Sequence, residues 1–204
     1  KQFQPAPPEF EWSRLGPMRR TAIKRVQQCN WAQAVEGGVD SSHVSFLHRR
    51  IDGPSVSSQG KAFPKYATDD SHPVFDVREA GHGLIIGARR DAEADSYYWR
   101  ITQCLMPFYT MIPPVMEGTD SEGSYYSGHA WVPIDDENTW TWTFSANPHR
   151  DYSDEEMKIH GGRDGNWGPI DENYFPRQNM ANNYLMDRRA QKETNYTGIH
   201  GIAN

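Results

Sequence analysis

Apolar and polar side chains alternate along much of the chain between residues 74 and 146, which is the pattern of half-buried β-strands. Short polar turns separate the alternating segments, and Pro113-Pro114 ends one of them because proline cannot donate into a sheet ladder. Strands joined by such short turns pair antiparallel, since parallel pairs need long crossovers. The pattern predicts a meander with strands at Val74–Arg78, Gly83–Ala88, Tyr97–Met106, Tyr109–Ile112, Tyr125–Ile134 and Thr139–Phe144.

Weaker patterns precede this meander. Residues 21–28 alternate only roughly and predict an edge-like strand. Residues 30–36 predict a short helix with Asn30 as N-cap and Gly37 as stop, and residues 40–48 predict a second one capped by Asp40 or Ser41. Residues 49–70 are rich in Gly, Pro, Ser and Lys and predict a long loop.

Beyond the meander, Ser153 and Glu156 have the spacing of a capping box, so a helix begins there and Gly161-Gly162 ends it. Residues 163–204 show little periodicity. A curved antiparallel sheet with helices on one side is an α+β fold. Trp99, Trp131, Trp140 and Trp142 alternate within strands and are most simply core, although one face of the sheet could line an aromatic pocket.

Composition narrows the class of protein. The 204 residues are 36% hydrophobic and include seven Trp, which is typical of a globular domain. A net charge of -6 argues against nucleic acid as a partner, because phosphate binding needs a basic surface. The chain has no apolar run of membrane-spanning length and no signal-peptide core, so we expect a cytoplasmic protein without membrane contact.

Residues 40–48 concentrate the candidate chemistry. His43 and His48 lie five residues apart, and Asp40 precedes His43 by three, so Asp40 and His43 share a helix face. On an ideal helix the two histidines would be about 140° apart. Both reach one ion only if the turn widens or His48 lies at a frayed helix end. Two His and one carboxylate form the iron site of non-haem Fe(II) oxygenases, whereas the simpler alternative is a pair of surface or capping residues.

At these residues the chain resembles the C-terminal catalytic domain of Rieske non-haem iron ring-hydroxylating oxygenases, in particular the phthalate 4,5-dioxygenase branch. The resemblance covers nearly the whole chain, and the Asp-x2-His-x4-His run is its most specific part. It is carried by Asn30-Trp31, Glu36-Gly37-Gly38, the run of Asp40, His43 and His48, Met111-Ile112-Pro113-Pro114, residues 129–137, residues 183–188 and Gly198-Ile199.

The resemblance implies that His43 and His48 are ligands of a mononuclear Fe(II), and that Asp40 links this iron to the Rieske cluster of a neighbouring subunit. The third ligand should be a carboxylate much later in the chain, and we expect it beyond Asn204. Asp171 and Asp187 are alternatives within the chain, each more simply a turn or surface acid. The implied fold is the helix-grip (START/Bet v 1-like) fold, whose long C-terminal helix would also begin after Asn204.

The two cysteines bear on the domain organisation. A Rieske [2Fe-2S] cluster needs two Cys and two His, commonly as Cys-x-His pairs, but Trp31 and Met106 stand two residues after Cys29 and Cys104. We therefore expect the cluster in an upstream domain. Residues 1–12, with their prolines, are interpreted as the linker from that domain, and residues 13–204 as a C-terminally incomplete mononuclear iron domain.

Five arginines could hold an anionic substrate, because a guanidinium matches a carboxylate bidentately. They are Arg49, Arg50, Arg89, Arg90 and Arg100. Arg100 is the preferred candidate, since a charge within the Tyr97–Met106 strand needs a partner; an ion pair with Asp76 or Glu79 is the more probable alternative on general grounds. The other histidines, at 72, 82, 129, 149, 160 and 200, are expected to be surface or hydrogen-bonded residues.

The leading hypothesis is O2- and NADH-dependent hydroxylation, by cis-dihydroxylation, of a phthalate-type aromatic acid. The resemblance implies a homotrimer that takes electrons from an NADH-dependent reductase. O-demethylation of a methoxylated aromatic acid is an alternative within the family. A metal-free helix-grip ligand-binding module is another, and it predicts that His43 and His48 diverge in space. A Zn hydrolase lacks support because the chain has no His-Glu-x-x-His helix.

Overall fold

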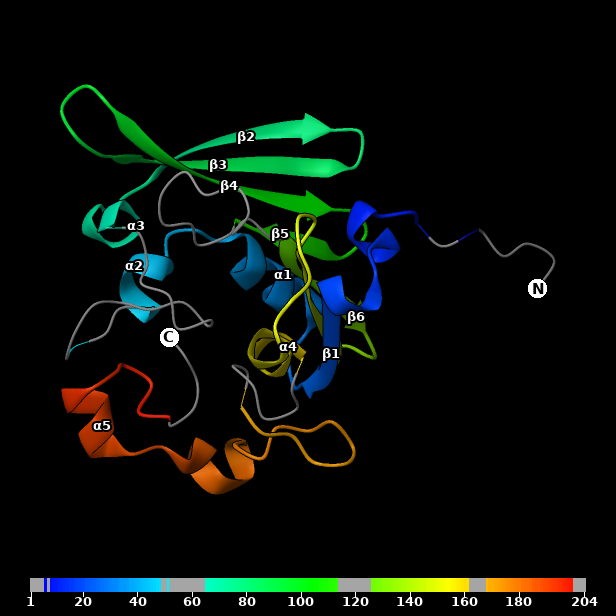
Figure 1. Ribbon diagram of the computed structural model, residues 1–204. Coiled ribbons are helices and arrows are strands. Elements are labelled where there is room, and N and C mark those ends of the chain that lie inside the picture. The colour runs from blue at the N-terminus through cyan, green and yellow to red at the C-terminus, as the bar shows by residue number, and fades with distance from the viewer. Residues whose placement is uncertain are drawn as a thin grey trace.

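The computed structural model describes residues 6, 8–48, 51, 65–113, 126–161 and 168–199. One seven-stranded antiparallel sheet organises the fold, with strand order β1-β7-β6-β5-β4-β3-β2 (Figure 1). The predicted meander is confirmed, and β1 closes it by pairing with β7. The strands are β1 (Arg20–Gln27), β2 (Val74–Ala80), β3 (Gly83–Asp91), β4 (Tyr97–Leu105), β5 (Tyr109–Ile112), β6 (Tyr126–Pro133) and β7 (Thr139–Ala146).

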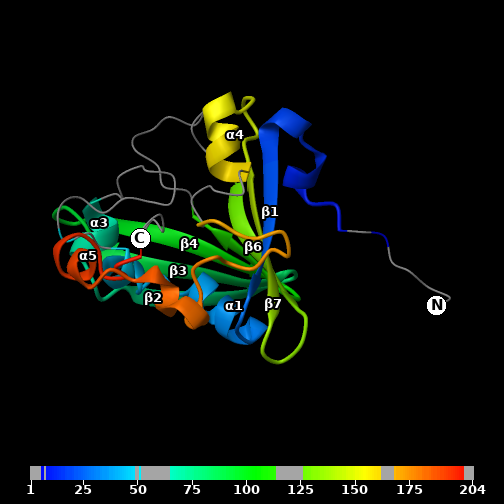
Figure 2. The same ribbon diagram turned by 90° about the horizontal axis from the view of Figure 1, so that it is seen from below.

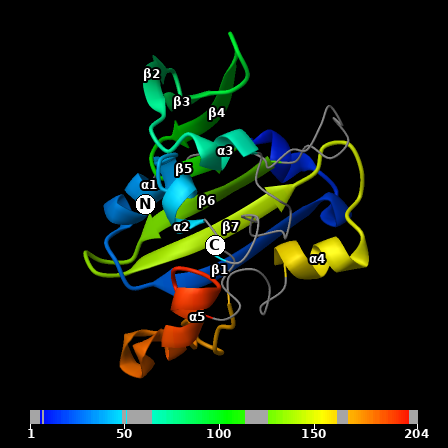
Figure 3. The ribbon, with the colours of Figure 1, turned by 90° about the vertical axis from the view of Figure 1, so that its left-hand side faces the viewer.

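Helices α1 to α4 gather on one face of the sheet, which Figure 3 views from their side. Helix α1 contacts β5 and β6, α3 contacts β3 and β4, and α4 contacts β1. The predicted α+β class, a curved antiparallel sheet with helices on one side, is confirmed. The helices are α1 (Trp31–Val39), α2 (Val44–Leu47), α3 (Lys65–Asp69), α4 (Asp154–Gly161) and α5 (Arg188–Glu193), with 3-10 turns η1 (Glu11–Arg14), η2 (Pro17–Arg19) and η4 (Met180–Leu185). None of the helices within the described ranges has the length and apolar character to cross a membrane.

The strand register divides the side chains between two faces. The helix-covered face, here called the inner face, carries Arg100, Thr110 and His129. Thr110 on β5 pairs with His129 on β6, and Arg100 lies an even number of residues from the β4 partner of Thr110, so all three side chains point to the same face. Its buried side chains are mostly polar, which the sequence pattern did not predict. They are Thr21, Arg90, Arg100, Thr102, Thr110, His129, Thr139, Thr141, Thr143 and Ser145.

The opposite, outer face carries much of the aromatic surface. Trp12 of η1 stacks on Phe144 at a centroid distance of 5.2 Å, so the N-terminal segment covers part of this face. The prediction that the strand tryptophans are core is right for Trp131, which is 7% exposed, but wrong for Trp99 and Trp142, which are 45% and 40% exposed. Alternation assigns a side chain to a face, and it does not say whether another layer covers that face.

Helix α1 departs from its predicted length. Asn30 caps it as predicted, accepting a hydrogen bond from the backbone N–H of Ala32, but the helix continues through Gly37 and Gly38 to Val39. A Cβ on Gly38 would lie 2.9 Å from Thr110 Oγ1 and 3.1 Å from Trp131 Nε1. Gly38 therefore permits close packing of α1 on the sheet, and this contact favours helix at a residue with poor helix propensity.

Two further helical predictions are refined. The predicted capping box of α4 is confirmed, since Ser153 N–H donates to the Glu156 carboxylate and Glu156 N–H donates to Ser153 Oγ. The predicted loop over residues 49–70 contains helix α3 at its end, where the Lys65–Asp69 sequence has no glycine or proline. The rest of that loop, with Arg49 and Arg50, lies outside the described residues, as do Pro114, Gly162 and His200.

The two edges of the sheet differ. At β1, the N–H of Val26 donates to the carbonyl of Tyr174 at 2.9 Å, and the Lys24 ammonium lies 4.3 Å from the Tyr174 ring centroid. At the other edge, β2 is last in the strand order and carries exposed Val74, Phe75 and Val77. Figure 2 shows the same sheet from below, with α4 beside β1.

Candidate metal centre

The candidate centre is built on the loop that links α1 to α2. Asp40 caps the end of α1 through its N–H, which donates to the Glu36 carbonyl at 3.0 Å. Its carboxylate accepts hydrogen bonds from the N–H groups of Ser42 (2.8 Å) and His43 (3.1 Å). The predicted helix over residues 40–48 is shorter than expected, because α2 begins only at Val44 and His43, not Asp40 or Ser41, is its N-cap. The Asp40 carboxylate instead closes the turn that precedes α2. Asp40 thus joins the two helices.

Helix α2 separates the two histidines by a single short turn. His43 is its N-cap, and His48 is its C-cap with φ -92° and ψ 7°, outside ideal helical geometry. The Nε2 atoms of His43 and His48 lie 3.1 Å apart. Because the helix ends at His48, the two rings are not held at the angle that an ideal helix would impose. A helix end at His48 was one of the two conditions under which both histidines could reach one ion. The metal-free module predicted divergent histidines, and these converge.

The electrostatic surroundings favour a neutral His48. Burial, together with the neighbouring His43 and Arg100, lowers the pKa of His48 to about 4. Burial raises the pKa of Asp40, but the hydrogen bonds from Ser42 and His43 outweigh it and the net pKa lies below the ordinary value. Asp40 Oδ2 lies 3.3 Å from Nδ1 of His43. A carboxylate on Nδ1 orients an imidazole so that its Nε2 lone pair faces away from the acid.

Two arginines of the inner face lie under this loop. Arg90 on β3 is 1% exposed and donates to Ser41 and to the carbonyl of Asp70. Arg100 on β4 is 5% exposed and near enough to His48 to lower its pKa. Arg89 points to the outer face, with its guanidinium 4.4 Å from the Tyr97 ring centroid. Arg89 and Arg90 are successive residues of β3 and therefore point to opposite faces of the sheet. This alternation is the sequence signal that could have distinguished Arg90, beside the site, from Arg89.

The two acids offered as ion-pair partners of Arg100 are not placed to pair with it. Asp76 lies on the outer face and pairs with Arg78 at 3.1 Å. Glu79 is on the inner face but registers with Leu84 and Cys104, four residues along β4 from Arg100. At about 3.4 Å per residue, that offset is roughly 14 Å.

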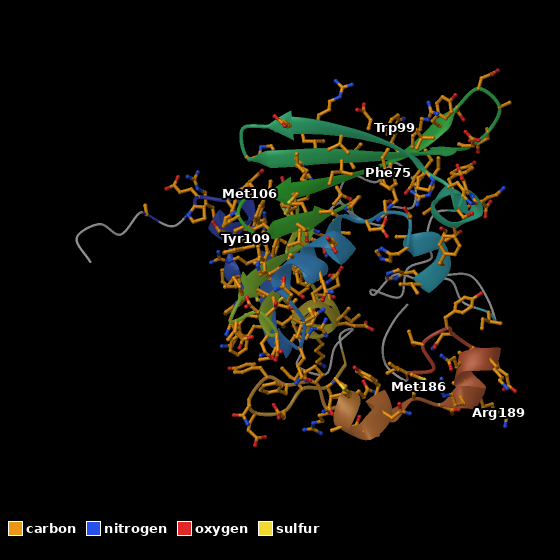
Figure 4. The ribbon with its side chains drawn as sticks, turned by 180° about the vertical axis from the view of Figure 1, so that it is seen from behind. Phe75, Trp99, Met106, Tyr109, Met186 and Arg189 are labelled. Atoms are coloured by element: carbon orange, nitrogen blue, oxygen red, sulfur yellow. The ribbon has the colours of Figure 1, made fainter. Side chains whose placement is uncertain are left out.

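The third metal ligand is not found in the part of the chain that the structure describes, where no cluster of three or more His, Cys, Asp or Glu side chains could hold an ion. Asp171 accepts hydrogen bonds from the N–H groups of Asn173 and Phe175 within a turn. Asp187 caps α5, which lies away from the sheet and carries Arg189, labelled in Figure 4. Both acids have the turn or capping roles that were their simpler interpretation.

Elsewhere, the structure separates aromatic surface from the histidine pair. A cavity of about 660 Å³ on the outer face is lined by Phe10, Trp12, Tyr109, Trp142 and Phe144, among others. It is an aromatic pocket of the kind that the strand pattern allowed, but it lies across the sheet from His43 and His48. On the inner face, His129 is buried and shares a 3.0 Å hydrogen bond with Thr143, as expected for a hydrogen-bonded histidine.

Comparison with known proteins decides the family. The family model described as "LigXa C-terminal domain like" matches residues 2–204. The chain belongs to the LigXa C-terminal domain-like family. This LigXa-like chain is 31% identical to the phthalate 4,5-dioxygenase oxygenase subunit of Pseudomonas putida, over 98% of the chain and 46% of that protein. It is 28% identical to the 3-chlorobenzoate-3,4-dioxygenase oxygenase subunit of Comamonas testosteroni, over 99% of the chain and 48% of that protein.

The LigXa-like chain thus spans about half the length of these curated relatives. Among solved structures, dicamba monooxygenase bound to 3,6-dichlorosalicylic acid gives a TM-score of 0.49 at 17% identity, covering 74% of this chain and 46% of that one. The resemblance to a Rieske oxygenase catalytic domain of the phthalate 4,5-dioxygenase branch is confirmed by the family and by these relatives.

The residues of the LigXa-like domain fit a ferrous ion. Two imidazole nitrogens at about 2.1 Å from one ion and at right angles to each other are roughly 3.0 Å apart, on the distances usual for His ligands. The Nε2 separation of 3.1 Å agrees with this geometry. His43 and His48 are the residues that would hold the ion, and a carboxylate from outside the described residues would complete the set.

Proposed function

We propose that this chain is the mononuclear-iron part of an oxygenase that hydroxylates an aromatic acid, with His43 and His48 as two ligands of Fe(II). The convergence of the two Nε2 atoms at 3.1 Å carries the proposal. Surface histidines have no reason to face each other at this distance, since two imidazoles gain little from one shared hydrogen bond. The named activities of the curated relatives, both dioxygenase oxygenase subunits, support the same class of reaction.

The ion, when bound with a carboxylate expected beyond Asn204 as its third ligand, would supply open positions for dioxygen beside the substrate. The residues of this chain orient and shield that site. Asp40 holds His43 through Nδ1, which fixes the tautomer with the lone pair on Nε2. Burial keeps water from one side of His48.

Electrons would come from NADH through a separate reductase and the [2Fe-2S] Rieske cluster of the upstream domain. We assign Asp40 the role of connecting that cluster, in the neighbouring subunit of a homotrimer, to the iron ligand His43. The Asp40 side chain is 40% exposed, so a group from another subunit has access to it while it contacts His43. We expect the whole assembly in the cytoplasm.

The substrate is proposed to be a phthalate-type aromatic carboxylate, with Arg100 as its anchor. Arg100 brings a positive charge to the inner face near His48. A guanidinium fork recognises a carboxylate in two parallel hydrogen bonds. The reaction is cis-dihydroxylation in the first instance, and O-demethylation of a methoxylated aromatic acid is the alternative that product analysis would reveal.

The decisive experiment is metal and sulfide analysis of the full-length protein purified without oxygen, beside its His43→Ala variant. We expect about three irons and two acid-labile sulfides per chain in the wild type, from a [2Fe-2S] cluster and one mononuclear site. The variant should lose one iron and keep both sulfides. Equal iron in the two proteins would refute the ligand role of His43, and an absence of any metal would favour the ligand-binding module.

A further inference from the structure

Arg90 is a buried cation that donates three hydrogen bonds, within the described residues, to the loops around the candidate centre. Its Nη2 donates to the Ser41 carbonyl at 2.6 Å, its Nη1 donates to Ser41 Oγ at 3.2 Å, and its Nε donates to the Asp70 carbonyl at 3.0 Å. At 1% exposure, the guanidinium has little access to water or to a ligand. A charge that is this buried must be held by such bonds, since leaving it unsatisfied is costly.

The bond to Ser41 connects Arg90 to Asp40 through one peptide group. The Ser41 carbonyl and the Ser42 N–H belong to the same peptide unit, and that N–H donates to Asp40 Oδ1 at 2.8 Å. A cation on the carbonyl side polarises the peptide and strengthens its N–H as a donor. The series Arg90, the Ser41-Ser42 peptide, the Asp40 carboxylate and His43 is therefore continuous.

The bond from Arg90 Nε to the Asp70 carbonyl connects this series to the other side of the site. Asp70 follows α3, and its Oδ2 accepts a hydrogen bond from the N–H of Asp91, next to Arg90 on β3. Arg90 thus ties the α1–α2 loop and the end of α3 to the same position of the sheet.

We infer that Arg90 is a positioning residue of the metal centre: by holding the Ser41-Ser42 peptide it fixes the Asp40 carboxylate and, through it, the His43 ring. The expected effect of Arg90 on metal affinity rests on the proposed function. Its expected effect on the order of the loop does not, since that is measured in the protein without metal. Arg100 differs from Arg90, since Arg100 is the proposed contact of the substrate.

The test uses the full-length protein with its mononuclear site emptied of metal, as wild type, Arg90→Met, Arg90→Lys and Arg89→Met. Arg89→Met is the matched control, because Arg89 is the neighbouring arginine on the same strand and faces away from the site. Amide hydrogen exchange of residues 40–48 is measured without metal. The affinity and visible absorption spectrum of Co(II) at the mononuclear site are then measured by titration.

In Arg90→Met we expect faster exchange of the Ser42 and His43 amides, while the amides of β6 and β7 keep their rates. We expect Co(II) affinity to fall about 10- to 100-fold, the usual effect of losing a group that orients a metal ligand. Arg89→Met should match the wild type. Arg90→Lys keeps the charge but not the fork, so its exchange should lie between those of wild type and Arg90→Met; it decides the question if Arg90→Met does not fold.

Two results would distinguish a failure of the positioning role of Arg90 from a failure of the proposed metal site. Wild-type exchange rates and Co(II) affinity in folded Arg90→Met or Arg90→Lys would overturn the positioning role. His43→Ala binding Co(II) as tightly as the wild type would instead overturn the proposed metal site, while the exchange data would still report whether Arg90 orders the loop.

Discussion

Arg100 places a positive charge near His48 on the inner face of the sheet, and its replacement tests the choice of substrate. We expect Arg100→Met to raise the KM for an aromatic carboxylate about 10- to 100-fold, because a hydrogen bond to a charged group is worth about 1.5–3 kcal/mol. Iron content should not change. The control is the KM of the variant for an uncharged amide analogue of the same compound, which should equal that of the wild type. An equal rise in KM for both compounds would show that Arg100 does not recognise the carboxylate.

Asp40 is not itself a proposed metal ligand: it orients the proposed ligand His43, and its proposed role in turnover is electron transfer. Asp40→Asn has the same shape but replaces one acceptor oxygen by an N–H2 donor, so it cannot keep both bonds to the loop and the contact with His43 Nδ1. We expect the variant to hold one mononuclear iron per chain when Fe(II) is in excess, although with lower affinity because His43 is less well oriented, and to lose transfer of an electron from the reduced Rieske cluster. Rapid-mixing measurement of cluster oxidation tests this, and normal turnover would exclude the role.

His129 makes stability depend on pH. Burial and the nearby Arg25 charge lower its pKa to about 3 in the folded protein, whereas an unfolded histidine titrates near 6.5. The unfolded chain therefore binds more protons between these values, so stability is complete above about pH 6.5 and declines as the pH falls toward 3. His129→Gln should reduce the slope of unfolding free energy by about 1.4 kcal/mol per pH unit in this window. Urea unfolding at pH 5 and 6 measures the slope, and an unchanged slope would contradict the buried neutral state.

At the scale of secondary structure, helix α1 offers a matched pair of glycines. Gly38 lies against Thr110 and Trp131, whereas a Cβ on Gly37 would meet nothing within 4 Å. Gly38→Ala should destabilise the protein by about 1–3 kcal/mol, since overpacking costs more than the gain in helix propensity. Gly37→Ala should stabilise it by about 0.5–1 kcal/mol. Thermal unfolding of both variants tests the pair, and a stabilising Gly38→Ala would mean that α1 can move away from the sheet without cost.

The same helix shows what sequence patterns can and cannot predict. Caps depend on neighbours along the chain, so Asn30 and the Ser153–Glu156 box were predictable. The end of α1 depends on its packing against Trp131, about a hundred residues away, and was not. The convergence of His43 and His48 needed the actual geometry of a four-residue helix, because ideal helix angles place the rings apart.

For the whole molecule, the strand pattern and its short turns predicted the meander of β2 to β7, but neither the pairing of β1 with β7 nor the polarity of the inner face. Register follows from the turns and from period two, both of which are local. The buried threonines beside Arg100 and His129 break the usual rule that the covered face is apolar. That departure coincides with the side of the sheet that carries the proposed metal centre, and functional sites are where a fold most often gives up stability.

The difference between the two sheet edges limits how copies of this chain could join. Added strands extend a sheet only where backbone groups are open. At the β1 edge, the Tyr174 carbonyl already accepts the Val26 N–H. The other edge strand, β2, carries the exposed apolar side chains of Val77 and Phe75, and Trp99 on β4 is also exposed (Figure 4). Growth at one edge only is self-terminating: β2 of one molecule can meet β2 of a second, and no third can follow. Sedimentation of this domain alone, as distinct from the full-length protein for which a homotrimer is proposed, should therefore show monomers and pairs. Val77→Lys should leave monomers, whereas a ladder of larger species would show that the β1 edge is open as well.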